Sequence, residues 1–496
     1  MNTYIGIDLG TSAVKALLVN ENGVILNEKS CSYPLLIPKE NYSEQDPNEW
    51  FEKTINVIKL LLINQDKSLV KAISFGGQMH GLVMLDKNDL VIRPAILWND
   101  GRAIEETNYL NQTIGKEKIS SYTGNIAFAG FTAPKLLWVY SNEKENFDKI
   151  NKIMLPKDYL IYKMTGVFAS DVSDASGLLL LDVKKRKYSK EMLSLCHINE
   201  TNLPKLYESY EVIGFLKKEI AQEIGLSNNV KIVAGAGDNA AAAIGTGTIG
   251  NGACNISLGT SGTIFLSSDR FCVDEKNALH SFCSASGQYH LMGCILSAAS
   301  TRKWWLENIL EDDNYELDEK KLDDSNVIFL PYLTGERSPH NDVDARGAFV
   351  NLSITTTRGQ MSKAILEGVA FALKDCLEVA KKNGVYPTYS TICGGGSKSK
   401  AWKQIIADVL NIPIRVLKTN QGPAFGAAIL AMVGDGIYLN VDSACKKIIK
   451  EEETILPNES RVKYYQDKYE IFKKLYPALK VLYRKDNLWK FLLIQQ

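Results

Sequence analysis

The sequence predicts an α/β protein built from two similar lobes that meet near one aspartate. The first observation is a repeat, because the residues Leu-Gly-Thr-Ser occur at 9–12 and again at 258–261. Between the copies, the stretch 231–250 has an apolar run, then glycines that allow a sharp turn, then alanines typical of a helix. The length of 496 residues is also too great for one ordinary hydrophobic core. We therefore expect two domains, at residues 1–248 and 249–496.

The composition is that of an ordinary soluble protein and argues against several classes of partner. Lys plus Arg and Asp plus Glu number 57 each, so the charge favours neither nucleic acid nor a membrane surface. Apolar stretches are interrupted well before the ~20 residues that span a bilayer, and no secretion signal is visible. The nine cysteines lack a Cys-x-x-Cys pair, which favours reduced thiols over disulfides or zinc. We expect a cytoplasmic protein.

The N-terminal segment is predicted to form three consecutive strands joined by tight turns. Apolar runs occur at 4–9, 16–19 and 24–26, and Asn22-Gly23 between the last two is a favoured hairpin turn. The first turn, residues 10–12, presents backbone N–H groups and two hydroxyls, which suits a phosphate. A plain polar hairpin is the alternative for one copy. Two copies that face each other across a cleft could hold a polyphosphate from both sides.

A helix and a glycine-flanked polar segment follow. Asp46 as a cap with Pro47 at the first position predicts a helix start, and we assign that helix no chemistry. The next strand, residues 71–75, leads into glycines that flank Met79 and His80. This pattern is typical of a pocket wall where a small ligand approaches the backbone. The alternative for His80 is a core histidine with satisfied hydrogen bonds.

A second polar cluster, Trp98-Asn99-Asp100, combines an aromatic face with an amide and a carboxylate. The indole face of Trp98 could pack against the C–H surface of a sugar, while the polar groups bind its hydroxyls. The alternative for Asp100 is a turn aspartate. Farther along, Asp171 and Asp174 could bind a cation, although their setting favours turn hydrogen bonds.

Asp238 lies at the predicted corner between a strand and a helix, where a side chain can project into a cleft. The alternative is a carboxylate that only caps the helix. Residues 235–240 also fit the G-x-G-x-x-A pattern of dinucleotide-binding proteins. That pattern requires an acidic residue about 20 positions later, and neither Asp nor Glu occurs between Asp238 and Asp269. A carboxylate in such a loop would also repel a pyrophosphate, so we do not favour this interpretation.

The second half repeats the order of strand, turn and helix. Residues 358–382 have apolar positions at helical spacing and end at Asn383-Gly384, which predicts a long amphipathic helix. A strand at 391–393 then leads into three glycines, where a flat ligand such as adenine could lie on bare backbone. A tight connection without a ligand is the alternative. The small-residue segment 422–434 is predicted to be a packing helix, and the charged tail after residue 451 a superficial helix.

Ordered motifs along the chain resemble those of the FGGY carbohydrate kinases, from Tyr4 to about residue 435. The segments GGQMHGLVMLD and RPAILWNDGR further resemble the family members that phosphorylate D-xylulose. The motifs that carry the resemblance are IGIDLGTSAVK (5–15), GGQMHGLVMLD (76–86), RPAILWNDGR (93–102), GFTAPKLLWV (130–139), LPKDYL (155–160), ASDVSDASG (169–177), GDNAAAAIG (237–245), SLGTSG (257–262), FLPYLTGERSPHN (329–341) and GGGSKSKAW (394–402).

This resemblance implies an actin-like, ribonuclease-H-like fold of two duplicated domains, each with a mixed sheet and helices, around a central cleft. The implied reaction is phosphorylation of D-xylulose by ATP with Mg²⁺, giving D-xylulose 5-phosphate and ADP. The family also suggests a homodimer. Ribulose, glycerol and gluconate are alternative substrates, and a non-kinase actin-like ATPase is the rival class.

The resemblance also implies roles for individual residues. Asp238 matches the general base that accepts the proton of the sugar hydroxyl, and Asp8 matches the carboxylate that holds hydrated magnesium. Met79 and His80 match the substrate-contact pair. The further implied contacts are Asn239, Trp98 and Asp100 for the sugar, Thr11, Ser12, Gly259 and Thr260 for the phosphates, and Gly395, Gly396 and Ser397 for the adenosine.

Two departures limit what is carried over. Residues 12–15 read Ser-Ala-Val-Lys, whereas glycerol-type relatives have further hydroxyls and an arginine there. The helix expected at 297–303 lacks the glycine and glutamine that such relatives place near the nucleotide. We therefore assign no nucleotide contact to that helix.

Overall fold

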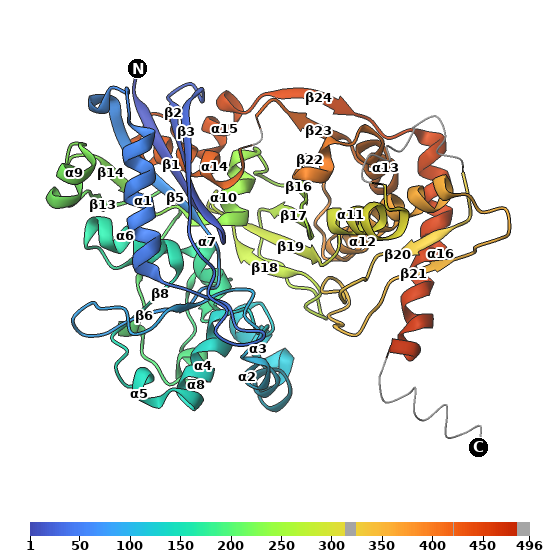
Figure 1. Ribbon diagram of the computed structural model, residues 1–496, viewed down its shortest axis with the longest axis horizontal. Coiled ribbons are helices and arrows are strands. Elements are labelled where there is room, and N and C mark those ends of the chain that lie inside the picture. The colour runs from blue at the N-terminus through green and yellow to red at the C-terminus, as the bar shows by residue number, and fades with distance from the viewer. Residues whose placement is uncertain (313–323, 420, 484–496) are drawn as a thin grey trace.

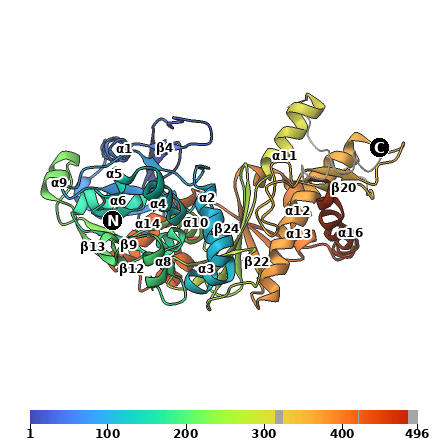
Figure 2. The same cartoon turned by 90° about the horizontal axis from the view of Figure 1, so that it is seen from below.

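The structure, a computed structural model, describes residues 1–312, 324–419 and 421–483. Two α/β lobes stand side by side along the longest axis of the molecule (Figures 1 and 2). Each lobe is built on one mixed sheet with helices on its faces. Within the described residues, no helix has the length and apolar character needed to cross a membrane.

The sheet of the first lobe begins with the three predicted strands, which are confirmed as an antiparallel meander. β5 then pairs parallel to β1, β14 and β15 pair parallel to β5, and β13 pairs antiparallel to β14. The strands are β1 (Thr3–Leu9), β2 (Ala13–Asn20), β3 (Ile25–Ser32), β5 (Val70–Gly77), β13 (Val212–Phe215), β14 (Lys231–Val233) and β15 (Ala236–Gly237).

The sheet of the second lobe repeats this arrangement. β16, β17 and β19 form the antiparallel meander, and β22 pairs parallel to β16 as β5 does to β1. β23 then pairs parallel to β22, and β18 and β24 are the edges. The strands are β16 (Ala253–Leu258), β17 (Gly262–Ser268), β18 (His280–Cys283), β19 (Tyr289–Ile295), β22 (Tyr389–Cys393), β23 (Ile414–Leu417) and β24 (Glu451–Ile455).

The helices cover the sheets, and the described ranges also contain five two-stranded sheets. The helices are α1 (Pro47–Leu61), α2 (Ile104–Asn108), α3 (Lys116–Thr123), α4 (Thr132–Asn142), α5 (Lys144–Phe147), α6 (Pro156–Thr165), α7 (Val172–Ala175), α8 (Lys190–Leu195), α9 (Lys218–Ile224), α10 (Asp238–Gly245), α11 (Ala299–Trp304), α12 (Arg358–Lys382), α13 (Lys400–Leu410), α14 (Gly422–Asp435), α15 (Val441–Ile448) and α16 (Glu459–Tyr483). The small sheets pair β4 (Glu44–Gln45) with β7 (Ala95–Ile96), β6 (Val83–Leu85) with β8 (Lys152–Met154), β9 (Ala169–Asp171) with β12 (Lys205–Tyr207), β10 (Leu181–Asp182) with β11 (Lys187–Tyr188) and β20 (Ile328–Leu330) with β21 (Ala348–Val350).

Helix α14 comes from the second half of the sequence but packs on the first lobe. Its residue Ala424 lies against Gly6 of β1, where an added Cβ would be 1.9 Å from the Ala424 carbonyl oxygen. Gly426 lies equally close to Ala241 of α10. Glycines at both crossings are therefore needed for this close approach of backbones. The boundary at residue 248 stays a prediction, and the two lobes do not coincide with the two halves of the chain.

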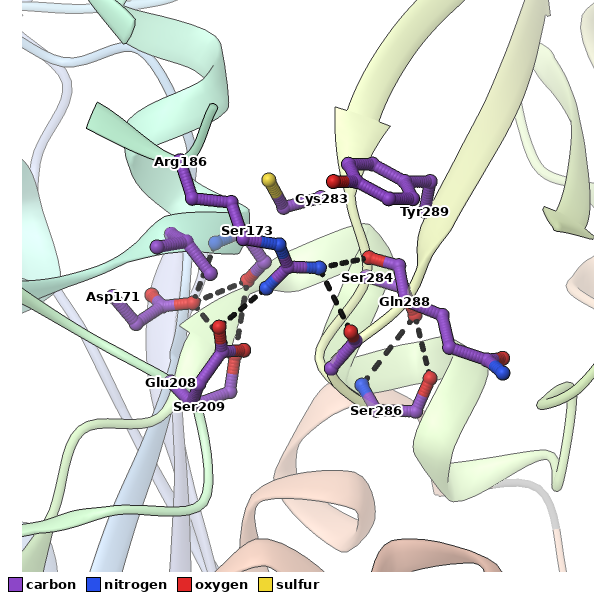
Figure 3. A network of polar contacts seen from close by, with 12 residues as sticks. Asp171, Ser173, Arg186, Glu208, Ser209, Cys283, Ser284, Ser286, Gln288 and Tyr289 are labelled. Atoms are coloured by element: carbon purple, nitrogen blue, oxygen red, sulfur yellow. Dashed lines mark hydrogen bonds and ion pairs between the residues drawn. The ribbon is translucent and has the colours of Figure 1, made fainter. Parts of the chain in front are cut away.

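Side chains of the first lobe also reach across to the second. Arg186 forms an ion pair with Glu208 in its own lobe and donates from Nη2 to the backbone carbonyls of Gly287 (2.9 Å) and Gln288 (2.6 Å) in the turn between β18 and β19 (Figure 3). Asn125 bonds both the N–H and the carbonyl of Ser281 in β18, at 3.0 and 2.8 Å. The lobes are therefore joined at β18 and β19 by bonds to backbone.

The expectation of a superficial C-terminal helix is wrong for α16. Its aromatic residues Tyr465, Tyr469 and Phe472 are at most 3% exposed and belong to the core that α12 and α13 share. Apart from the buried Lys468, charged residues such as Lys463, Glu470 and Lys473 are exposed on the helix. The helix is therefore amphipathic, which its average composition does not indicate. Residues 484–496 of the predicted tail lie outside the described residues.

The contact of α10 with α14 predicts a sharp limit on residue size. In Gly426→Ala, the added Cβ would lie 1.8 Å from the Ala241 carbonyl oxygen, so the helices must separate. We expect a loss of about 1–3 kcal/mol of stability, as for overpacked cores, measured as a lower midpoint of thermal or urea unfolding. Gly214→Ala is the control, because its Cβ would first meet a Val167 methyl at 3.3 Å. Equal midpoints for the two variants would contradict the close packing.

Candidate active site

Two half-buried carboxylates, Asp8 and Asp238, lie at the same edge of the first sheet. Asp8 is the penultimate residue of β1 and is in register with Gly76 of β5. Asp238 is the first residue of α10 and directly follows β15, whose Gly237 is in register with Gly77. Alternation along β1 turns Asp8 toward the same face as Gly6, which α14 covers. Topology therefore brings together two residues that are far apart in the sequence.

Both carboxylates bind protons more tightly than an exposed aspartate does. The pKa of Asp8 is raised to about 7, first by burial and next by the charge of Asp238, while Lys15 acts in the opposite direction. The pKa of Asp238 is raised to about 6 by burial, against two hydrogen bonds from Asn239. Those bonds come from its backbone N–H at 2.7 Å and its Nδ2 at 2.9 Å. The pair can therefore accept a proton or a cation near neutral pH.

The first Gly-Thr-Ser turn joins β1 to β2 beside these carboxylates. The Thr11 hydroxyl accepts from Trp98 Nε1 at 3.0 Å, and its carbonyl accepts from Gln45 Nε2 at 2.7 Å. Gln78, at the end of β5, fastens the turn through its own N–H to the Leu9 carbonyl. Ser12 is exposed at the tip. The structure thus brings Trp98, expected at the sugar, into contact with a residue expected at the phosphates.

The second turn joins β16 to β17 in the equivalent place. The Gly259 carbonyl accepts from Ala299 N at 2.8 Å, and the Thr260 carbonyl accepts from Ala298 N at 3.0 Å and Ser300 Oγ at 2.6 Å. The start of α11 therefore fixes this turn, while the Thr260 side chain stays exposed. Ser12 in the first turn and Thr260 in the second are therefore exposed at the ends of equivalent hairpins.

His80 is held in a single orientation and is uncharged. Its backbone is left-handed with φ of 70°, and its Nδ1 lies 2.8 Å from the Gly177 carbonyl oxygen. The ring stacks on Phe131, with 4.5 Å between centroids, while Thr132 and Lys135 donate to its carbonyl. Burial lowers the pKa of His80 to about 3. Because a carbonyl can only accept, Nδ1 carries the proton and Nε2 is an acceptor.

The expected sugar-contact pair lies next to the expected base. Met79 is 5% exposed, and a Cβ added at Gly237 would be 2.9 Å from its Cγ and Sδ atoms. Gly237 directly precedes Asp238, so Met79, His80 and Asp238 belong to one neighbourhood. Asn239 also belongs to it through its bonds to Asp238.

Asp100 is placed differently from the other expected contacts. Its carboxylate is buried and accepts from Ser43 N at 2.6 Å and from Arg102 Nε at 2.9 Å and Nη2 at 2.8 Å. Arg102 also pairs with Glu44 at 2.6 Å. These bonds occupy both oxygens within the loop. The geometry favours the turn-aspartate alternative over a sugar contact for Asp100, and its role in sugar binding stays an untested prediction.

Two of the three glycines after β22, Gly395 and Gly396, border a small cavity of about 230 Å³. Gly394 has φ of 85° and is pressed against Leu258, whereas a Cβ on Gly395 would meet nothing within 4 Å. The Ser397 hydroxyl turns back to the Gly394 carbonyl at 2.7 Å. The cavity is lined by Gly395 and Gly396, by Trp402, and by Ala299, Arg302, Lys303, Leu306 and Glu307 of α11 and the turn after it.

Sequence reasoning missed several residues of this neighbourhood. Phe131 and Lys135 belong to the segment 130–139, whose only signal is the family resemblance, and no local signal connects Gly177 to His80. Arg302 and Lys303 have no predicted nucleotide contact, because their helix departs from the glycerol-type pattern. A larger cavity of about 570 Å³ in the second lobe, bordered by Lys363 and Arg461 among others, contains none of the expected site residues.

Comparison with known families decides the class of this site. The FGGY N-terminal domain of carbohydrate kinases matches residues 3–245, and the FGGY C-terminal domain matches residues 254–434. The chain belongs to the FGGY family of carbohydrate kinases. This FGGY kinase therefore has the predicted two-domain α/β fold of the actin-like, ribonuclease-H-like class, and the rival class of non-kinase ATPase is not favoured.

Individual relatives of the FGGY kinase match along nearly its whole length. It is 41% identical to the xylulose kinase of Escherichia coli over 488 residues, covering 96% of this chain and 99% of the relative. A solved structure described as a xyloylose kinase from Brucella ovis is 39% identical, with a TM-score of 0.92 and coverage of 97% and 100%. The gluconate kinase from Lactobacillus acidophilus is 29% identical, with a TM-score of 0.93 and coverage of 97% and 99%.

The buried neutral His80 predicts a pH-dependent effect on stability. Below about pH 6.5 the unfolded chain protonates this histidine, whereas the folded chain does so only near pH 3. Folding therefore loses stability as the pH falls through this range. We expect the difference in unfolding midpoint between His80→Gln and the original protein to shift steadily in favour of the variant as the pH is lowered from 6.5 to 4. The difference should be constant above pH 7. A difference independent of pH would contradict the burial of a neutral imidazole.

Proposed function

We propose that this FGGY kinase transfers the γ-phosphoryl group of ATP to D-xylulose, giving D-xylulose 5-phosphate and ADP. The observation that carries this proposal is the nearly full-length identity of 35–41% with the xylulose kinases of Escherichia coli and Staphylococcus xylosus. The adjacency of Met79, His80 and Asp238 supports it, because a sugar held by the first two would lie close to a carboxylate.

Asp238 is proposed to be the general base. A hydroxyl is a poor nucleophile, so a carboxylate must accept its proton as the oxygen attacks the γ-phosphorus in line. The pKa of Asp238, about 6, leaves it ionised at neutral pH with a higher proton affinity than that of an exposed aspartate. The two bonds from Asn239 fix one carboxylate oxygen and leave the other for the substrate.

Asp8 is proposed to hold hydrated magnesium. Mg²⁺ commonly binds one or two carboxylates together with substrate phosphates and water. The raised pKa of Asp8 indicates a carboxylate whose charge is poorly compensated, as a metal ligand requires. When bound, the ion would spread the charge of the transferring phosphoryl group. Within the described residues, no group of three or more His, Cys, Asp or Glu side chains could hold a metal alone, so phosphate oxygens would have to complete the site.

The remaining expected contacts divide between the two substrates. The N–H groups and hydroxyls of Thr11, Ser12, Gly259 and Thr260 would bind the phosphates, and the adenosine would occupy the cavity beside Gly395, Gly396 and Ser397. His80 Nε2 would accept a hydrogen bond from a sugar hydroxyl, since Nδ1 is bonded to Gly177. Closure of the lobes would exclude water and limit ATP hydrolysis. A homodimer and a cytoplasmic location remain expectations.

Gluconate is the alternative substrate that a specific observation favours. The gluconate kinase from Lactobacillus acidophilus matches with a TM-score of 0.93, which is as high as that of the xylulose kinase from the same organism. The overall fold therefore does not separate the two sugars, and only the contacts near Met79 and His80 would do so.

Substrate and base are tested together by ADP release from purified protein with magnesium-ATP. We expect strong stimulation by D-xylulose and less by L-xylulose, D-ribulose, glycerol or gluconate. Asp238→Asn should fold normally and lose at least about 10²-fold in kcat, because it removes a general base. Near-normal turnover in this variant would exclude Asp238 as the base. If another sugar gives the highest rate, the choice of D-xylulose is wrong and the kinase assignment remains.

The acidic limb of the pH profile gives a second test of Asp238. Since the base must be ionised to accept a proton, kcat/KM for the sugar should fall as the pH drops through about 6. His80→Gln should retain this limb, because His80 stays neutral until about pH 3. A kcat/KM that stays constant down to pH 5 would contradict the assignment.

A further inference from the structure

A buried lysine lies at the centre of three carboxylates behind the proposed base. Lys157 of α6 has 0% of its side chain exposed, and its Nζ is 2.7 Å from Asp158, 2.8 Å from Asp171 and 3.5 Å from Asp174. The cation considered for Asp171 and Asp174 on sequence grounds is therefore a side chain of the protein itself. Nothing in the proposed reaction uses this cluster.

Two hydrogen bonds connect the cluster to the base. Asp171 Oδ2 accepts from the Ser173 hydroxyl at 2.5 Å, and that hydroxyl accepts from the backbone N–H of Gly237 at 3.2 Å. Gly237 directly precedes Asp238. Ser209 also donates to Asp171 Oδ2, at 2.7 Å (Figure 3). The peptide that leads into Asp238 is therefore anchored, through Ser173 and Asp171, to Lys157.

The aliphatic part of the Lys157 side chain also packs against the end of strand β5, next to the strand that leads into the base. A Cβ added at Gly77 would lie 2.8 Å from the Lys157 Cβ, so the lysine is in direct contact with the last residue of β5. Gly77 in turn pairs in register with Gly237 of β15. Lys157 is therefore connected to Gly237 in two indirect ways, through its packing on Gly77 and through the polar contacts of Asp171 and Ser173.

Asp174 is the member of the cluster without hydrogen-bond partners. Neither of its carboxyl oxygens has one among the residues that the structure describes, and Lys157 is already in shorter contact with Asp158 and Asp171. Burial raises the pKa of Asp174 well above its usual value, and the charges of Asp158, Asp171 and Asp238 act in the same direction, against Lys157. One cation cannot compensate three carboxylates away from water.

The other elements that pack on α7 add no cation that would keep Asp174 ionised. Burial lowers the pKa of His280 well below its usual value and raises that of Cys283 to about 12, so both are neutral. The titratable residues of the elements in contact with α7 are Asp171 of β9, Lys205 and Tyr207 of β12, Asp238 of α10, and His280 and Cys283 of β18, and Lys157 and Asp158 of α6 lie beside the same cluster. Among them, Lys205 is exposed.

We propose that Asp171 and Ser173, anchored by Lys157, are positioning residues for Asp238, and that Asp174 stands behind the base as a neutral carboxylic acid. This inference rests on the proposed role of Asp238. Its consequence is that the base is oriented from the interior of the lobe, on the side away from the substrates. If Asp174 were ionised, its negative charge would raise the pKa of Asp238 further, and a neutral Asp174 avoids this effect.

The positioning role is tested by two matched serine variants. Ser173→Ala and Ser209→Ala each remove one hydroxyl that donates to Asp171 Oδ2, but only Ser173 carries the bond to Gly237. We expect kcat to fall about 10-fold or more in Ser173→Ala, as for other small displacements of a catalytic group. KM for ATP should stay unchanged, and Ser209→Ala should keep its kcat. Equal kcat values in the two variants, with similar decreases in the unfolding midpoint, would overturn the proposal. The network would then contribute to stability and not to the position of Asp238.

The neutral state of Asp174 is tested by Asp174→Asn, which reproduces the shape and charge of the protonated acid. We expect the acidic limb of kcat/KM to stay at the same pH and kcat to be retained. If Asp174 were ionised, the substitution would remove a negative charge beside Asp238 and move the limb to lower pH by about one unit. That shift, or a large loss of kcat, would overturn the assignment.

Failure of the proposed function has a different signature. In that case the unsubstituted protein would release no ADP in response to any sugar. Failure of the present inference would leave that activity intact and would give the same kcat in Ser173→Ala and Ser209→Ala.

Discussion

Two aspartates, Asp8 and Asp238, are kept largely away from water at one edge of the first sheet, and the surrounding structure serves to hold them there. Removing a carboxylate from water disfavours its charged form, which raises the pKa of both residues. Burying such groups costs stability, which the packing of the neighbouring elements has to offset. The glycines of β1, β5 and β15 supply this support, because they let α14, Met79 and Lys157 approach the backbone beside each aspartate.

Among the residues that the structure describes, lysines lie around this pair without forming a close ion pair with either aspartate. Lys15 influences Asp8 at a distance, while its Nζ donates to Gln421 at 2.5 Å. Lys157 lies behind Asp238 and is held by three other carboxylates. A close ion pair with an aspartate would lower its pKa and occupy its oxygens. Keeping the cations back leaves both carboxylates free toward the substrate side.

Local signals predicted much of the fold, whereas contacts between distant segments were not predictable. The end of α12 follows from Asn383-Gly384, and the hairpin between β2 and β3 follows from Asn22-Gly23. The amphipathic nature of α16 and the cluster around Lys157 were missed. In the cluster, α6, β9 and α7 meet only through tertiary packing, and the spacing of these segments in the sequence does not indicate that they are in contact. The local hydrogen bonding of Asp100 could have been predicted from the sequence, because its partner Arg102 is only two residues away.

The packing of α14 on the first lobe gives the molecule more than one covalent connection between its halves. The chain enters the second lobe after α10, returns for α14 and α15, and leaves again for β24, which pairs with β23. A single linker would let one lobe twist freely against the other. Several crossings of the chain between the lobes resist such twisting. They leave rotation of one lobe toward the other about a single axis as the easier relative motion.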